Sequence, residues 1–84
     1  MKSKHRKTLA AIYCKPTLSG LVFGDIETLL IALGGMLDEG AGSRVTITLR
    51  GTRIHLHRPH PGKEAKKYQV EDVRAFLERL EIGP

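Results

Sequence analysis

The stretch RVTITLRGTRIHLH, residues 44–57, decides the fold because it contains two runs of alternating polarity separated by a turn signal. Apolar and polar side chains alternate in each run, which is the period-two pattern of a strand with one buried face. Arg50-Gly51 separates the two runs, and glycine supplies the positive φ that a tight hairpin turn often needs. The sequence therefore predicts an antiparallel β-hairpin.

The alternation also predicts the register of this hairpin. A two-residue loop places Leu49 opposite Thr52 and Arg44 opposite His57, and every pair between them agrees in polarity. One face of the hairpin then carries Val45, Ile47, Ile54 and Leu56. The other face carries Arg44, Thr46, Thr48, Arg53, His55 and His57. The apolar face predicts the core, and the polar face is expected to lie in solvent.

Helices are expected on both sides of the hairpin. Residues 25–33 have apolar side chains at i, i+3, i+4 and i+7 spacing, and residues 68–84 carry a similar stripe that ends near Gly83. A short helix over residues 3–15, capped by Ser3, is also expected. Residues 36–43 form either a short irregular edge strand or a loop. Since the hairpin has one apolar face, the simplest burial packs the helices on one side of a small antiparallel sheet, an α+β fold.

The composition indicates one domain, residues 1–84, with a polyanionic partner. The net charge is +5, but residues 42–67 alone carry seven basic side chains and one acidic one, and residues 1–17 carry five basic ones and none acidic. Concentrated positive charge favours a nucleic acid, although a solvated basic surface is the plainer alternative. The single Cys14 excludes an internal disulfide, fits a reducing compartment, and is expected to be a semi-buried side chain near a helix end.

No apolar run is long enough to span a bilayer, and the run TLAAIYC is short for a secretory leader. We therefore expect a cytoplasmic protein that has no membrane partner.

Histidines beside arginines on one exposed face suggest phosphate chemistry. Metal-free RNA cleavage needs a base for the 2′-hydroxyl, a cation for the phosphorane and an acid for the leaving oxygen. His57 beside Arg44 supplies two of these parts, and His60 or His55 could supply the third. Exposed strand histidines are more often inert, so spacing alone does not establish catalysis. The expected RNA-binding residues are Ser43, Arg44, Arg50, Arg53, His55, Arg58 and Lys63.

Other sites find less support. His55 and His57 share a face, but no cysteine or acid lies nearby in the sequence to complete a tetrahedral metal site, so no metal or other cofactor is expected. GGMLDEGAG lacks the lysine of a phosphate-binding loop. Few aromatic residues are present to stack on unpaired bases, which argues against a single-strand binding platform.

The segments GSR (42–44), RPHPGKE (58–64) and VRAFLERLEI (73–82) resemble the HicA-type toxins of bacterial toxin–antitoxin modules. The resemblance covers residues 24–83 and leaves the helix at 3–15 as an addition. It implies a fold like the double-stranded-RNA-binding domain, α-β-β-β-α, with a first strand at 36–42. It also implies metal-independent mRNA cleavage by a histidine and neutralisation by a HicB-type antitoxin.

One departure from the family pattern bears on activity. The family's catalytic histidine follows Gly-Ser, and Arg44 occupies that position here. His57, directly across the predicted hairpin, is the preferred replacement, and His60 between two prolines is the second. A third alternative is a module that binds double-stranded nucleic acid without cutting it, and a fourth is a domain whose basic face meets an acidic protein.

Overall fold

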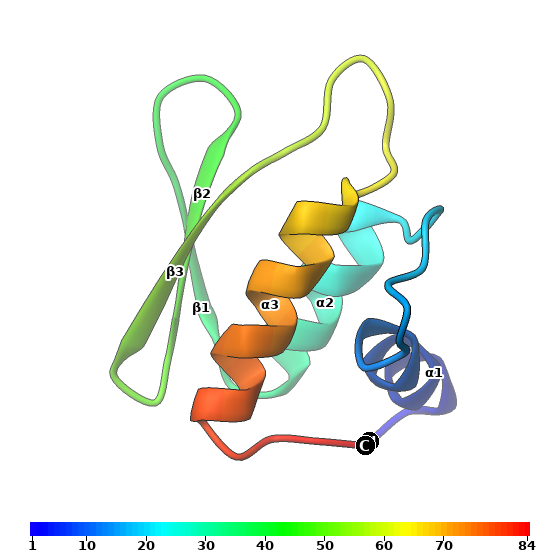
Figure 1. Cartoon of the computed structure of the whole chain (residues 1–84). Helices are drawn as coiled ribbons and strands as arrows, with labels where there is room; N and C mark the ends of the chain where they lie inside the picture. The colour runs from blue at the N-terminus through cyan, green and yellow to red at the C-terminus, as the bar shows by residue number, and fades with distance from the viewer.

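The computed structural model describes all residues, 1–84, and arranges them in three layers (Figure 1). The elements are α1 (Ser3–Ile12), α2 (Phe23–Ala32), β1 (Met36–Glu39), β2 (Arg44–Leu49), β3 (Thr52–His57) and α3 (Lys67–Arg79). The antiparallel sheet, in the order β1-β2-β3, forms one layer, and α2 and α3 cover one of its faces. The helix α1 packs on α2 and α3 from the side away from the sheet. The order α2-β1-β2-β3-α3 confirms the expected α+β class and is consistent with a double-stranded-RNA-binding-domain-like fold.

The predicted hairpin register is confirmed. β2 and β3 pair antiparallel with Arg44 opposite His57 and Leu49 opposite Thr52. The two residues of the turn, Arg50 and Gly51, have φ of 51° and 77°. Positive φ at both central positions is the requirement of the type I′ hairpin turn, whose twist matches that of the flanking strands.

The first strand is regular, and the alternative of a loop is wrong. Met36–Glu39 pairs with β2 over its whole length, with Leu37 opposite Ile47 on the side of the helices. The strand ends at Glu39, three residues before the end implied by the family pattern. The sequence did not distinguish a strand from a loop here because the segment is only four residues long and two of them are acidic, so alternating polarity cannot be recognised.

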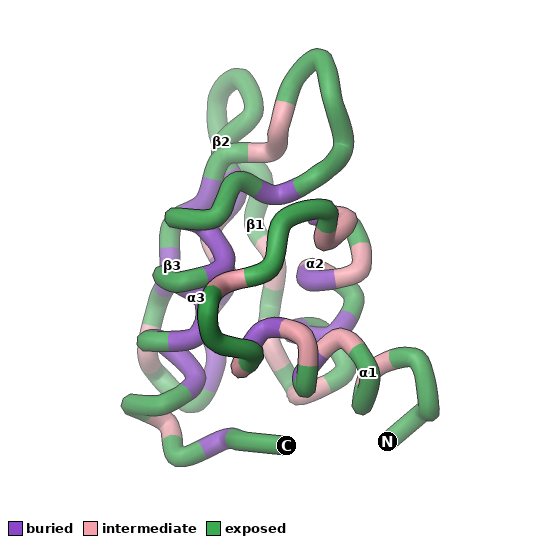
Figure 2. The backbone as a smooth tube through the Cα atoms, turned by 45° about the vertical axis from the view of Figure 1, so that its right-hand side comes forward, coloured by how far each residue is buried: buried purple, intermediate pink, exposed green.

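The core lies between the sheet and the helices, as the buried residues in Figure 2 show. It contains five apolar residues of the hairpin, the four predicted ones and Leu49, together with the apolar stripes of all three helices. Gly35 lets the chain turn from α2 into β1 against this core. A Cβ there would lie 2.7 Å from the carbonyl oxygen of Leu30 and 2.9 Å from the Cγ2 of Ile47, so the position has no room for a side chain.

A buried arginine fastens α1 to α3. Arg74 is 8% exposed, and its guanidinium donates hydrogen bonds to the carbonyl oxygens of Ile12 and Cys14, at 2.8 and 3.0 Å. A third bond, of 2.9 Å, goes to the hydroxyl of Thr17. These carbonyls lie at the carboxyl end of α1, where the helix dipole favours a positive charge. The added helix is therefore held by polar as well as apolar contacts.

Three expectations for α1 are wrong. The helix ends at Ile12 rather than at residue 15, and Arg74 satisfies the carbonyl oxygens of Ile12 and Cys14 at this end. Ser3 is the first helical residue and not the cap; Lys2 occupies the N-cap position, with no side-chain cap bond. Cys14 is exposed rather than semi-buried, since it lies past the end of the apolar stripe.

None of the three helices combines the length and the apolar character needed to cross a membrane.

Candidate nucleic-acid interface

The outer face of the sheet carries a basic, histidine-bearing surface. The helices cover only the inner face, so Arg44, Arg53, His55 and His57 are all exposed (Figure 1). The strands alternate between buried and accessible residues along β2 and β3, as the hairpin register requires. On the β1 side the face carries Asp38, opposite Thr46, so the positive charge is concentrated on β2 and β3.

Arg44 and His57 lie directly opposite each other at one end of this face. Directly opposed residues of an antiparallel pair have Cβ atoms about 4.5–5.5 Å apart. Neither side chain has an ion-pair or hydrogen-bond partner elsewhere in the chain. Both line an open hollow of about 460 Å³, together with His55, Thr46 and residues of the loop between β1 and β2. A guanidinium and two imidazoles therefore face one hollow that is open to solvent.

His55 is held in place by its cross-strand partner. The hydroxyl of Thr46 lies 3.0 Å from Nδ1 of His55, within hydrogen-bond distance. This contact fixes the orientation of the ring, and Nε2 has no partner within the chain. An imidazole oriented through one nitrogen can exchange a proton through the other. His55 is therefore available for proton transfer in the same hollow as His57.

His60 lines a second hollow, of about 270 Å³, which His57 also lines. Ser43 and Arg58 line it from the sheet end, and Lys66, Tyr68 and Gln69 line it from the start of α3. His57 thus forms a wall of both hollows, whereas His55 and His60 each line one of these two. The two candidate acid groups, His55 and His60, therefore each share a hollow with His57.

Tyr68 and Gln69 are residues of this region that the sequence analysis missed. Gln69 is 3% exposed; its Nε2 donates a 2.6 Å bond to the carbonyl oxygen of His57, and its Oε1 accepts a 2.9 Å bond from the backbone N–H of Lys66. Its side chain therefore ties the end of β3 to the start of α3. Helical spacing is the sequence feature that could have identified Tyr68, because it places this aromatic residue outside the apolar stripe that begins at Val70.

Arg58, an expected RNA contact, is paired with carboxylates of this chain. Its Nε lies 2.9 Å from Glu27 of α2, and its guanidinium lies 3.3 Å from Glu39 of β1. The hydrogen bond to Glu27, assisted by the charges of both carboxylates, raises the pKa of Arg58 above its usual value. Arg58 thereby joins β3 to α2 and β1, and its charge is less available to a ligand than that of Arg44.

The remaining expected contacts lie apart from the two hollows. Arg53 is on the same outer face, nearer the hairpin turn and opposite Thr48. Arg50 turns toward the end of α3 and donates a 3.1 Å bond to the carbonyl oxygen of Leu80. Lys63 lies in the loop between β3 and α3, beside a further hollow that His60 also lines. No three His, Cys, Asp or Glu side chains converge as a metal site requires.

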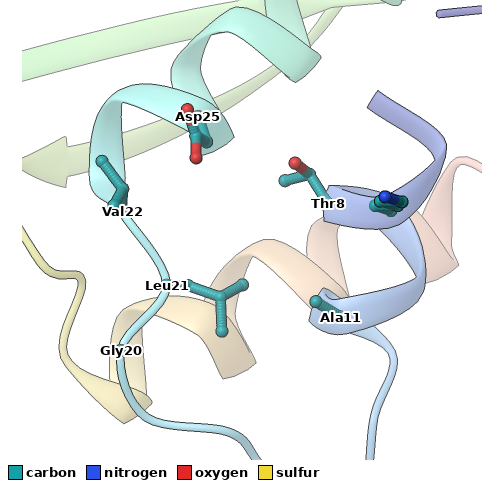
Figure 3. A pocket seen from close by; sticks show the side chains of 7 residues that line it. Thr8, Ala11, Gly20, Leu21, Val22 and Asp25 are labelled. Carbon is teal, nitrogen blue, oxygen red and sulfur yellow. The ribbon is translucent and has the colours of Figure 1, made fainter. Parts of the chain in front are cut away.

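A separate hollow lies between α1 and the segment that enters α2 (Figure 3). Thr8 and Ala11 line one wall, and Leu21, Val22 and Asp25 line the other. It contains no histidine, and α2 and α3 separate it from the outer face of the sheet. We therefore place the candidate site on the sheet.

These features define a small α+β protein with one helix-covered sheet face and one exposed basic face bearing histidines. Among protein-family models, the one described as HicA toxin of bacterial toxin-antitoxin matches residues 23–82. The chain belongs to the HicA toxin family, as the resemblance of its motifs suggested. The matched residues run from the start of α2 past the end of α3, so α1 lies outside them. Searches of curated proteins and of solved structures found no match.

Proposed function

We propose that this toxin is a metal-independent endonuclease of mRNA, restrained in the cytoplasm by a HicB-type antitoxin. Membership of the HicA family makes it the toxin component of a toxin–antitoxin module. The observation that carries the finer proposal is the placement of Arg44 opposite His57 on an exposed face, in one hollow with His55.

The cleavage step requires no group from outside this hollow. His57 takes the proton of a 2′-hydroxyl, whose oxygen then attacks the adjacent phosphorus while the bond from phosphorus to the 5′-oxygen breaks. Arg44 neutralises the phosphorane, since its planar fork matches two phosphate oxygens. A second histidine donates a proton to the departing 5′-oxygen. The products are a 2′,3′-cyclic phosphate and a 5′-hydroxyl.

His55 is our first candidate for the acid. It lies two residues from His57 on the same face of β3, a separation of about 6.8 Å along a strand. Its ring is oriented by Thr46, which favours proton donation in a fixed direction. His60 is the second candidate, because it approaches His57 from the other hollow.

Binding of the RNA chain is assigned to the basic residues around His57. In this proposal Ser43, Arg44 and His57 contact the reacting phosphate. Arg53 and Lys63, which are both exposed, contact neighbouring phosphates. The antitoxin would inhibit by covering the same exposed face with acidic side chains. Because phosphate contacts release counterions, the affinity for RNA should fall steeply as salt rises.

The test is incubation of the purified protein with a defined RNA in EDTA. The proposal predicts fragments that end in a cyclic phosphate for the wild type, and intact RNA with His57→Gln. His5→Gln is the matched control, since His5 lies on α1, on the side of the molecule away from the sheet. Cleavage by His57→Gln at the wild-type rate would remove His57 from the mechanism.

A second function has one observation in its favour. Arg44 replaces the histidine that the family places after Gly-Ser, and an arginine there is suited to binding a phosphate rather than to moving a proton. A non-catalytic module for double-stranded nucleic acid would give a salt-sensitive complex in the same experiment, with the RNA left intact.

A further inference from the structure

Tyr68 is an exposed aromatic residue at the edge of the candidate site. It lies in the first turn of α3, and 56% of its surface is accessible, whereas the apolar stripe of this helix, which begins at Val70, is buried. Tyr68 lines the hollow that contains His57 and His60, and a third hollow beside it that contains His55 and His57. Tyr68 therefore shares two hollows with His57, the residue proposed as the base.

Two part-buried hydrogen bonds of the next residue, Gln69, hold the start of α3 against the end of β3. The neighbouring Gln69 bonds the carbonyl oxygen of His57 through Nε2 and the backbone N–H of Lys66 through Oε1. The end of β3 and the start of α3 are thereby joined through one side chain. A tyrosine has only two side-chain torsions, so ordering it against a ligand costs little conformational entropy.

Attack by a 2′-hydroxyl on its own phosphate places a geometric demand on the RNA. The attacking oxygen, the phosphorus and the departing oxygen must lie in line, and a nucleotide stacked in an A-form helix does not adopt this arrangement. A nucleotide that leaves the stack can adopt it, and its freed base then needs a new surface. Aromatic side chains provide that surface for unpaired bases in RNA-binding proteins.

We propose that Tyr68 stacks on the unpaired base of the nucleotide beside the scissile phosphate. The substrate is then a looped or single-stranded segment of RNA rather than a continuous duplex. Lys66, which lines the same hollow, would neutralise a neighbouring phosphate. This inference rests on the proposed function, because it specifies the conformation of RNA that the same site accepts.

The first test is binding, so that it does not depend on cleavage. The probe is a hairpin RNA with 2-aminopurine at one loop position, fully 2′-O-methylated so that no 2′-hydroxyl can attack. Stacking on Tyr68 predicts quenching of the 2-aminopurine fluorescence by the wild type and by Tyr68→Phe, and little quenching by Tyr68→Leu. The affinity of Tyr68→Leu should be about 5- to 160-fold lower, which is the range for loss of one base–aromatic stack.

The second test compares cleavage of two RNAs with the same target sequence, one in a loop and one in a duplex. The wild type should prefer the loop, and Tyr68→Leu should lose most of this preference with its melting temperature unchanged. The control is Ile31→Ala, which alters an exposed apolar residue on a different helix, α2, and should keep the preference for the loop.

The outcomes separate the two proposals. Equal quenching and equal loop preference in the wild type and Tyr68→Leu would overturn the stacking proposal and leave the nuclease in place. Quenching that requires Tyr68, without cleavage of either RNA by the wild type, would support the stacking site and overturn the nuclease.

Discussion

Replacement of Arg74 by methionine tests how α1 is attached to the rest of the molecule. Arg74 is almost fully buried without a carboxylate partner, and three hydrogen bonds to the last residue of α1 and to the segment after it satisfy its guanidinium. Methionine fills a similar volume but leaves the buried carbonyl of Ile12 without this donor. A buried group that loses its partner costs about 1–3 kcal/mol, and the charged donor places the loss in the upper half of that range.

Relief of the desolvation of the guanidinium offsets part of this loss, so we expect a net destabilisation of about 2 kcal/mol. For a domain of this size each kcal/mol lowers the melting temperature by about 4–8 °C, which gives a decrease of roughly 8–16 °C. Urea unfolding followed by circular dichroism measures the free energy of unfolding directly. Arg74→Lys should be intermediate, because lysine keeps the charge but not the fork.

RNA binding by Arg74→Met at low temperature should equal that of the wild type, since α1 lies on the far side of α2 and α3 from the candidate site. A stability within 0.5 kcal/mol (roughly the scatter of a neutral surface substitution) would refute the assignment of Arg74 as the attachment of α1.

Three further predictions concern the scaffold. Gly35→Ala should lower the free energy of unfolding by about 1–3 kcal/mol in urea titrations, because its Cβ would lie 2.7 Å from the carbonyl oxygen of Leu30. Burial, and secondarily the charge of a nearby carboxylate, raises the pKa of Tyr13 above 10.0. The neutral phenol therefore stabilises the folded state fully below pH 10, and this stabilisation is lost as the pH rises through the pKa of the folded state. The stability difference between wild type and Tyr13→Phe should therefore be constant from pH 7 to 9 and shift against the wild type above pH 10. Arg58→Gln should lower the melting temperature, since Glu27, with a side chain only 14% exposed, loses its ionic partner; an unchanged melting temperature would show that this pair does not hold β3 to α2.

The hairpin and its polar face could be predicted from the sequence because their signals are local. Alternation across residues 44–57 and a glycine at the turn determine the register, and the register determines that Arg44 faces His57. The helices follow similarly from their apolar spacing. These signals involve residues a few positions apart, and each agrees with the others.

The remaining features depend on contacts between distant residues. From the sequence Arg58 was interpreted as a free basic side chain, because its pairing with Glu27 depends on α2 lying beside the end of β3. Arg50 was likewise predicted to contact RNA, but its guanidinium donates a hydrogen bond to the carbonyl oxygen of Leu80, thirty positions away. Tyr68 was passed over because nothing local in the sequence indicates that the start of α3 lies beside the end of β3, where Tyr68 and His57 line one hollow.

The location of α1 also bears on the basic residues of the N-terminus. The lysines of this helix lie on the side of the molecule opposite the exposed sheet face (Figure 1). A rigid RNA segment lying on that face would not reach them. The positive charge of the chain is therefore divided between two surfaces, and only the sheet surface carries the histidine pair.

The most direct measurement of the central claim is the single-turnover rate of RNA cleavage by His57→Ala, with and without added imidazole. A positioned base or acid contributes about 10²- to 10⁴-fold to the rate, so the substitution should slow cleavage by that factor. Imidazole should restore part of the rate in His57→Ala and have no such effect on the wild type. Cleavage by His57→Ala at the wild-type rate would show that the chemistry does not occur at the site where His57 faces Arg44.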